Sequence, residues 1–430
     1  MNNINLFKNK IFISINTILF YSILVFGRPL LGLYIFGFRI GEYLVGLGIL
    51  YIFYVLFNYR FFVKKLNRKF LLSYLGLITY FFINIIFDNS NSLTTFSFQT
   101  SAYIWYMSYF LMGIAILPLI KINQNFFYFG YFGLLCVYIL NLFFYPKFLI
   151  DFFLNYSDKF DFAKASEISI FYIFVTFFSI TIFQSDKNLN LFTIFSGLML
   201  PVIIFKSRSA GIAVIIYFLL MLYINRYKFK RDYKKNLSIL MIFILLFTFT
   251  SHRLVDNIFS FLDSDEAVAN VFKHKYVTSN TLETEKSIFY IVDNRIFSAD
   301  GNLNWRLQLW QDILNDLKNE NKIFNGLGFK SKIPTFNQPI YSGLDGTNHN
   351  SHNYFLNVFT RSGLIGFFLL MLLLFNQLKL TRPKYNFLEL TSYLFPIFFI
   401  SMFDGSMENP YFGILYYFSL SLFFINIRHN

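Results

Sequence analysis

Long apolar runs separated by short polar segments are the feature that most restricts how this chain can fold. A helix rises about 1.5 Å per residue, so about 20 apolar residues are needed to cross about 30 Å of hydrocarbon. Twelve runs approach this length, at 11–27, 40–57, 70–87, 101–120, 126–145, 167–183, 190–205, 209–225, 236–251, 354–375, 387–403 and 411–426. We therefore predict an all-α polytopic membrane protein with about twelve transmembrane helices.

Composition supports a membrane protein and argues against a nucleic-acid-binding domain. The chain is 56% hydrophobic and 14% charged, whereas soluble domains average about 45–50% and about 25%. The net charge of +14 comes from basic residues in short runs between apolar segments, without the basic stripe of a nucleic-acid-binding surface. The single cysteine, Cys136, lies in an apolar run, which excludes an intrachain disulfide and indicates a packing role.

Basic residues are distributed unevenly between the polar segments, and this sets the predicted orientation. Positive charge in short loops favours the cytoplasmic side. If the amino terminus is cytoplasmic, that side receives the cluster from Arg60 to Lys69 and the run from Arg226 to Lys235, while the short outer loops hold few basic residues. Both termini are then cytoplasmic. The chain divides into helices one to nine at 1–250, a large outer loop at 251–352 and helices ten to twelve at 353–430.

The outer loop contains one strong helical pattern. Asn302 is a plausible cap, Asn325-Gly326 is a plausible stop, and apolar residues recur between them at helical spacing, namely Leu303, Leu307, Trp310, Leu314 and Leu317. We predict an amphipathic helix that lies over the membrane domain. Arg306 is four residues before Trp310 and therefore shares its face; the spacing alone favours a salt bridge for this arginine.

The stretch from Asn348 to Gly366 passes from a polar loop with two histidines into an apolar helix. Imidazole has a reference pKa of about 6.5, which suits proton transfer near neutral pH. His352 lies where the loop meets the helix, a position at which polar residues are commonly functional. His349 raises the possibility of a metal pair, but the nearest carboxylate is Asp345 and no cysteine is nearby, so we predict no metal site.

A second polar group is Lys206-Ser207-Arg208-Ser209, at the start of the eighth predicted helix. Either serine can cap this helix, whose free amide groups then point to the outer side. A helix amino terminus beside an arginine is suited to binding phosphate. The alternative is that both basic side chains only reach the lipid interface. Arg361 lies nine residues after His352 on the same predicted helix and would need a partner there, and Asp404 and Glu408 in the last outer loop are possible acid partners.

These residues resemble the O-antigen ligase and polymerase family of bacterial surface-polysaccharide enzymes. The most specific part is His352-Asn353, followed after nine residues by Gly363-x-x-Gly366, which is similar to the histidine motif at the end of the family's large periplasmic loop. Ser207-Arg208-Ser209, the Arg306-x-x-x-Trp310 helix and Asn325-Gly326-Leu327-Gly328 support the resemblance. It covers about Phe205 to Gly366, while the first half of the chain is similar only as a string of helices.

The resemblance implies a glycosyltransferase at the periplasmic face of the bacterial inner membrane, with one large, partly helical periplasmic loop. Its donor would be a glycan linked through pyrophosphate to undecaprenol. His352 would be the catalytic base, Arg208 and Arg306 would bind the pyrophosphate, and His349, Asn353 and Lys206 would support the site. The family needs no metal or other cofactor. Expected partners are the donor, a glycan or lipid A core acceptor, membrane lipid and a chain-length regulator, with no nucleic acid.

Four possibilities remain open at this point. A polymerase that joins repeat units and a ligase that moves the finished chain to lipid A core share the donor chemistry. The Phe, Tyr, Lys and Asn bias is typical of an AT-rich gene, and on this ground we favour the polymerase. A flippase or other transporter of lipid-linked sugars would be expected to have repeats, interrupted helices and charges around a midplane site. A membrane scaffold gives no reason for His and Arg gathered on one side.

Overall fold

The computed structural model describes residues 10–66, 68–88, 95–117, 122–142, 146–157, 164–231, 233–261, 289–341, 349–381 and 385–424. They are mostly helical, as predicted, and also contain two small antiparallel hairpins that the all-α prediction did not include. The helices are α2 (Lys10–Leu31), α3 (Ile40–Phe57), α4 (Tyr59–Lys65), α5 (Arg68–Phe87), α6 (Thr95–Thr100), α7 (Ala102–Tyr106), α8 (Ser108–Ile116), α9 (Gln124–Leu142), α10 (Lys147–Tyr156), α11 (Ala165–Phe183), α12 (Asp186–Lys206), α13 (Arg208–Ile224), α14 (Arg226–Arg231), α15 (Tyr233–Phe261), α17 (Gly301–Asn319), α18 (Tyr354–Thr381), α19 (Phe387–Phe403) and α20 (Pro410–Leu420). Strands β1 (Tyr34–Ile35) and β2 (Phe38–Arg39) form one hairpin, β3 (Phe289–Val292) and β4 (Arg295–Ser298) the other, and short 3-10 turns are η3 (Pro334–Asn337), η4 (Ser406–Glu408) and η5 (Ser421–Phe424).

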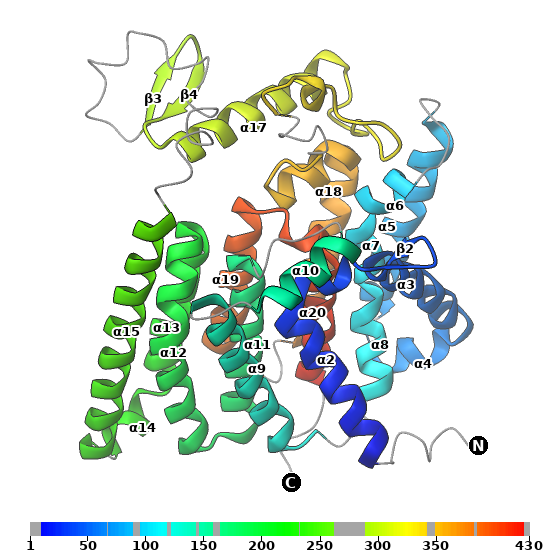
Figure 1. Ribbon diagram of the computed structural model, residues 1–430. Coiled ribbons are helices and arrows are strands. Elements are labelled where there is room, and N and C mark those ends of the chain that lie inside the picture. The colour runs from blue at the N-terminus through cyan, green and yellow to red at the C-terminus, as the bar shows by residue number, and fades with distance from the viewer. Residues whose placement is uncertain are drawn as a thin grey trace.

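Most of the helices run side by side in one bundle, and α17 lies across the end of it away from α14 (Figure 1). Each apolar segment predicted from the sequence coincides with a helix, or for 101–120 with the consecutive helices α7 and α8. Seven helices of the described ranges are long and apolar enough to cross a membrane, and five shorter apolar helices occupy the other segments. The last residues of the segments predicted at 101–120, 126–145 and 411–426 lie outside the described ones.

Side-chain caps explain where several of these helices begin. The Ser185 side chain accepts a hydrogen bond from the Lys187 amide at the start of α12, and Ser207 caps α13. Asn386 and Glu389 form a reciprocal capping box at the start of α19. Each cap satisfies amide groups that have no partner within their own helix.

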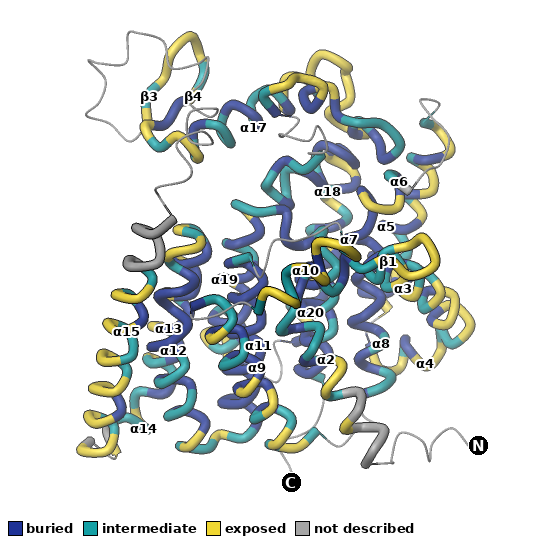
Figure 2. The backbone as a smooth tube through the Cα atoms, in the orientation of Figure 1, coloured by how far each residue is buried: buried dark blue, intermediate teal, exposed yellow. Residues whose placement is uncertain are grey.

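The core of the bundle surrounds α11, and exposure increases toward α15 (Figure 2). Of the most apolar part of α11, 94% of the residues are buried, against 11% for α15. Two tyrosines inside this core have hydroxyl partners, as buried polar groups usually do: Tyr131 contacts Ser179, and Thr176 contacts Tyr217, both at 2.8 Å. Helix α11 therefore forms the centre of the bundle, and its first turn provides a fixed support for the site residues beside it.

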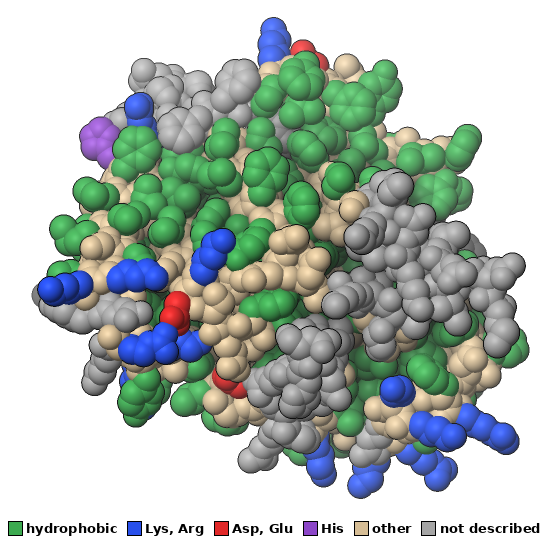
Figure 3. Space-filling model, turned by 90° about the horizontal axis from the view of Figure 1, so that it is seen from below, with side chains coloured by type: hydrophobic (Ala, Val, Ile, Leu, Met, Phe, Trp, Pro, Cys, Tyr) green, Lys and Arg blue, Asp and Glu red, His purple; other side chains and the backbone are tan. Residues whose placement is uncertain are grey.

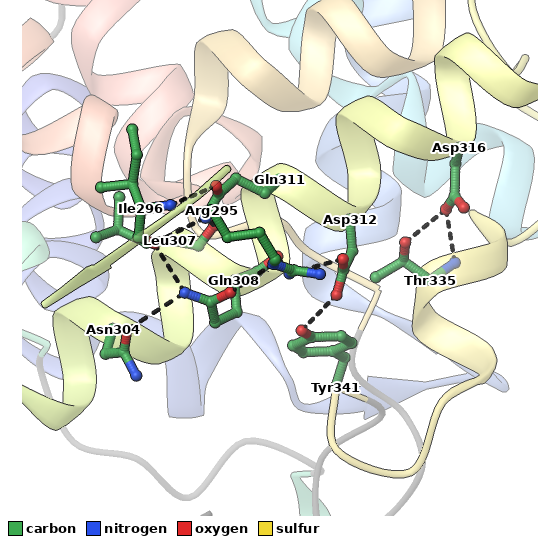
Figure 4. Close-up of polar contacts among 10 residues, drawn as sticks. All are labelled: Arg295, Ile296, Asn304, Leu307, Gln308, Gln311, Asp312, Asp316, Thr335 and Tyr341. Atoms are coloured by element: carbon green, nitrogen blue, oxygen red, sulfur yellow. Dashed lines mark hydrogen bonds and ion pairs between the residues drawn. The ribbon is translucent and has the colours of Figure 1, made fainter. Parts of the chain in front are cut away.

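An outer layer, formed by β3, β4, α17 and η3, has its own small core and polar network. Its apolar core consists of Leu309, Ile313, Ile333, Phe336 and Tyr341. Two glutamines of α17 bind the backbone of Ile296 on β4, and Asp312 pairs with Arg295 at 2.8 Å and accepts from Tyr341 at 2.6 Å (Figure 4). Asp316 accepts from both the amide and the hydroxyl of Thr335. These contacts make α17 a rigid cover.

The predicted helix at 302–325 is present, but its ends and buried face differ from the prediction. Asp300, and not Asn302, caps it by accepting from the Leu303 amide at 2.9 Å. It ends at Asn319 because Asn321 adopts a left-handed conformation with φ of 55°, and the Lys322 amide returns to Leu317 in a Schellman motif. The buried face carries Leu309, Ile313 and Leu317, whereas Leu314, predicted to be buried, is exposed.

Candidate functional site

A cavity of about 1090 Å³ lies between the bundle and the histidine loop. It is bounded by the end of α2, the first half of α3, the α6–α7 segment, residues 349–352 and the loop between α19 and α20. Its polar lining includes Arg28, Arg39, Glu42, Lys164, His349, Asn350, His352, Asn357, Asp404 and Glu408. On α3 the lining is largely apolar, with Val45, Leu47, Ile49 and Leu50. The space can therefore hold a ligand that is charged at one end and apolar at the other.

His352 lies on the wall of this cavity in a left-handed backbone conformation, with φ of 53°. Such a conformation costs a non-glycine residue about 1–3 kcal/mol unless its surroundings enforce it. Here the His352 amide donates to Asn350 Oδ1 at 2.7 Å, and the Trp305 ring contacts the imidazole edge-on with the ring centres 5.4 Å apart. The loop therefore presents the imidazole in one orientation.

Burial lowers the pKa of His352 from its usual 6.5 to about 4, because the charged form is poorly solvated. The positive charges of Arg306, Lys164 and Arg28 lower the pKa further, while Asp404 acts in the opposite direction. The imidazole is therefore neutral at physiological pH and can accept a proton. This is the protonation state that a general base needs.

Helix α17 holds the histidine loop from above. Trp310 Nε1 donates to the Ser351 carbonyl at 2.7 Å, and Trp305 Nε1 donates to the Ile340 carbonyl at 3.2 Å. Arg306, between these two tryptophans, is partly buried, and desolvation lowers its pKa while the charges of Asp404 and Asp300 raise it. Its Nε has no hydrogen-bond partner among the described residues. A cationic group with one buried donor that lacks a partner among the described residues thus lies close to His352 and Asp404.

The Gly-x-x-Gly pair of the motif marks a break in α18. Gly363 has φ of 64° and ψ of −169°, so the helical hydrogen bonds are interrupted there. The segment 323–328 takes their place: Leu327 and Gly328 donate to the carbonyls of Thr360 and Arg361, and Leu364 and Ile365 donate to those of Ile323 and Phe324, at 2.8–3.2 Å. A Cβ atom on Gly363 would lie 2.2 Å from the Phe324 carbonyl oxygen. The Asn-Gly-Leu-Gly turn and the glycine pair are therefore two halves of one backbone junction.

A second break occurs in α2 at Gly27, which has φ of 56° and ψ of −129°. It directs Arg28 to Glu167 at the start of α11, with Nε and Oε1 2.7 Å apart. Asn409 also donates to Glu167, at 2.9 Å. Irregular backbone at membrane depth is tolerated where it lines a cavity, and Arg28 does line it. Interrupted helices, one of the features expected of a transporter, are thus present here.

The two acids of the loop after α19 belong to the same site. Asp404 accepts from the Ser166 hydroxyl at 2.8 Å, and Glu408 accepts from the side-chain amides of Asn350 and Asn357 at 3.0 and 2.7 Å. Burial raises the pKa of Glu408 to about 8, against the lowering effects of the Asn357 amide and the Arg361 charge. The sequence suggested these acids only as possible partners of Arg361, and the fold brings both to the cavity that His352 lines.

Arg208 and Lys206 do not line the cavity. Arg208 begins α13 and pairs with Asp300, with Nη1 and Oδ2 2.5 Å apart, and 87% of its side chain is exposed. Lys206 is the exposed last residue of α12. Arg208 therefore lies at the edge of the outer layer, because Asp300 is also the cap of α17.

The supporting residues predicted around the base have distinct positions. His349 lines the cavity and packs edge-on against the Phe96 ring, with centres 5.2 Å apart. Asn353 caps α18 by accepting from the Leu356 amide at 3.1 Å. Within the described residues, no group of three or more His, Cys, Asp or Glu side chains could hold a metal ion; Asp345 lies outside that set.

Several residues of the candidate site were not predicted from the sequence. Arg28, Arg39 and Lys164 appeared only as basic residues of outer loops, although all three line the cavity. Asn350 and Asn357 carried no recognisable signal, because their partner Glu408 lies more than fifty positions away. The one available clue was Gly27-Arg28-Pro29 at the end of an apolar run, since glycine and proline together indicate an interrupted helix.

The fold and the cavity define a multi-pass membrane protein in which a neutral histidine, carboxyl groups and cationic side chains meet beneath an outer cover. Residues 191–371 match the model of the family described as O-antigen ligase. The match to this stretch confirms the resemblance found in the sequence and supports a polysaccharide-related glycosyl transfer. The match includes Arg208, Arg306, His352 and the glycine pair. No protein with a curated description matches the chain.

Proposed function

We propose that the protein transfers a glycan from an undecaprenyl-diphosphate carrier to a sugar hydroxyl, and that it polymerises O-antigen or capsule repeat units. The observation that carries this proposal is the position of the His352 imidazole on the wall of a large cavity with cationic and apolar parts, where burial lowers its pKa. The family match to residues 191–371 supports the reaction class.

In the proposed reaction, His352 removes the proton of the acceptor hydroxyl. The acceptor oxygen then forms a bond to the anomeric carbon of the donor, from the face opposite the leaving group. The bond between that carbon and the diphosphate oxygen breaks, and the electron pair leaves with undecaprenyl diphosphate. Positive groups near the diphosphate stabilise the charge that develops on it.

Four cationic side chains support a diphosphate position near His352. Arg28, Arg39 and Lys164 line the cavity, and Arg306 lies close enough to His352 to shift its pKa. We propose Arg306 as a diphosphate ligand on this ground. Arg208 remains a proposed ligand that would act from the edge of the outer layer, with Lys206 beside it. The apolar α3 lining would accommodate the start of the prenyl chain.

We propose that the site faces the periplasm and that both termini are cytoplasmic, in a bacterial inner membrane. The face seen from below carries many more Lys and Arg than Asp and Glu side chains among the described residues (Figure 3). Excess positive charge favours the cytoplasmic side, which supports a periplasmic position for α17. The corresponding division is twelve spans, with 1–250 and 353–430 in the membrane and 251–352 as the periplasmic segment.

A ligase that transfers the finished chain to lipid A core is the second candidate, because the matching family is described as O-antigen ligase. Deleting the gene in the native host separates the two. Loss of a polymerase leaves core with a single repeat unit, whereas loss of a ligase leaves long chains on the carrier lipid. A chain-length regulator is expected as a partner only for the polymerase.

Replacing His352 by alanine in the full chain tests the proposed base. We expect protein at the normal level and complete loss of polymeric surface glycan, resolved by length on a gel. His349→Ala measures the contribution of the other cavity histidine, and His252→Ala, at an exposed position of α15, is the matched control. A normal length ladder from His352→Ala would show that the assignment is wrong.

A further inference from the structure

We infer that Glu408 is a positioning residue that fixes the backbone of His352 through the side chain of Asn350. The inference rests on the proposed function, since it concerns the residue that we propose as the base. Glu408 lies in η4, after α19, and Asn350 lies 58 positions earlier in the histidine loop. The contact therefore joins two segments that only the fold brings together.

The Asn350 side chain has one orientation that satisfies both of its neighbours. Its nitrogen donates to Glu408 Oε2 at 3.0 Å, and its oxygen accepts from the His352 amide at 2.7 Å. A carboxamide has an acceptor at one end and a donor at the other. If it turned over, its nitrogen would meet the His352 N–H group, donor against donor. The acceptor on Glu408 thus decides which end of Asn350 faces His352.

Glu408 also holds the helix that follows the histidine. Its Oε1 accepts from Asn357 Nδ2 in the first turn of α18, at 2.7 Å. On the side away from the cavity the Asn350 carboxamide packs closely against Gly405, where an added Cβ atom would lie 2.0 Å from its Nδ2. The residues before and after His352 are therefore anchored to one carboxyl group, which maintains the left-handed backbone at His352.

The substitution Glu408→Gln distinguishes a positioning role of this side chain from a direct role in catalysis. The glutamine oxygen can accept from Asn350, and the glutamine nitrogen can donate to the Asn357 oxygen once that amide turns over. Asn357 Oδ1 has no hydrogen-bond partner among the described residues, so it is available for this contact. Burial raises the pKa of Glu408 to about 8, and the protonated form that glutamine resembles is therefore well populated at neutral pH. Glutamine cannot donate or accept a catalytic proton.

The experiment measures kcat and KM of the purified full chain with lipid-linked repeat unit extracted from a host that lacks the gene. The variants are Glu408→Gln, Glu408→Ala, Asn350→Ala and His352→Ala. We expect Glu408→Gln to keep activity within about threefold, and Glu408→Ala and Asn350→Ala to lose about 100-fold in kcat with little change in the donor KM, since small misplacements of reacting groups have effects of this size.

Two results would overturn the inference. One is a folded Glu408→Gln protein that is as inactive as Glu408→Ala, because the carboxyl group would then act through its charge or proton. The other is full activity in Asn350→Ala, which decides the matter even where Glu408→Ala does not accumulate. If His352→Ala is as active as the wild type, the proposed function fails. If His352→Ala is inactive while Glu408→Ala and Asn350→Ala are fully active, only the positioning role fails.

Discussion

His352 and Arg208 stand at corresponding places in the molecule but are held in different ways. Each lies beside the start of a helix, α18 or α13, and each contacts the amino-terminal half of α17 or its cap. His352 is enclosed by Trp305, Asn350 and the cavity wall. Arg208 is 87% exposed and has one described ion-pair partner, Asp300. The two sites therefore differ in rigidity, although both were predicted from similar sequence patterns.

This difference indicates that His352 and Arg208 have different roles in the proposed reaction. A base must be in place before the acceptor arrives, so its position is fixed by several hydrogen bonds and by packing. An exposed ion pair contributes at most about 1 kcal/mol, and its arginine can exchange a carboxylate for a phosphate at little cost. His352 is suited to the chemical step, while Arg208 is suited to a ligand that enters and leaves.

The largest expected effect is that of Gly363→Ala, which disrupts the backbone junction in α18, the helix that begins beside His352. The new Cβ atom would meet the Phe324 carbonyl oxygen at 2.2 Å, and φ of 64° is unfavourable for alanine. We expect a loss of stability of about 3 kcal/mol or more and loss of activity as the junction with 323–328 opens. Gly76→Ala, where the nearest atom is 3.9 Å away, is the control and should be neutral in a thermal unfolding assay.

Arg306→Gln tests whether the cation beside His352 takes part in the reaction. Removing a preorganised charge from a transition state typically costs about 100-fold in kcat, and we expect a loss of this size with normal protein levels. Arg306→Lys should recover part of the activity because it restores the charge. Lys318→Gln, at an exposed position of the same helix, is the control. Equal activity in Arg306→Gln and the control would remove Arg306 from the site.

The positions of the apolar helices along the chain could be predicted because apolar length is a local property. The segments that became α3, α11, α12 and α19 were located from hydropathy alone. The break at Gly363 could not be predicted, since glycine inside an apolar run is as compatible with close helix packing as with a break. Only the pairing of 323–328 with α18 distinguishes the two.

The candidate site was predicted where a motif was contiguous and missed where it was assembled from distant segments. His352 and Gly363 belong to one stretch of sequence, whereas Arg28, Lys164 and Glu408 reach the cavity from three others. The buried face of α17 was misjudged for a related reason. Its sequence offers two apolar stripes, and the outer-layer core selected the one with Leu309 and Ile313 over the one with Leu314.

The pH dependence of activity tests how firmly His352 is enclosed. With a pKa of about 4, the imidazole stays neutral down to about pH 5, so we expect constant kcat from neutral pH to that point and a fall of about tenfold per unit below pH 4. The folded-state pKa lies below the unfolded value, so stability should also decline as pH falls from 6.5 toward 4. Trp305→Ala admits water to the imidazole, so the acid limb of the pH–activity profile should move to higher pH. An unshifted limb would show that Trp305 does not keep water from the imidazole.

The smallest effect is expected at Arg208, from Asp300→Asn. Asparagine keeps the side-chain oxygen that caps α17 by accepting from the Leu303 amide, but it removes the charge that competes for Arg208. If Arg208 binds the donor diphosphate, its release should lower the donor KM about two- to threefold without changing kcat, in line with the weakness of exposed ion pairs. The effect should disappear in the double variant with Arg208→Ala, which alone should raise the KM. A KM that is unaltered in both single variants would make the pair a structural contact between α13 and α17, and the contrast with His352 would then be one between a site residue and a surface residue.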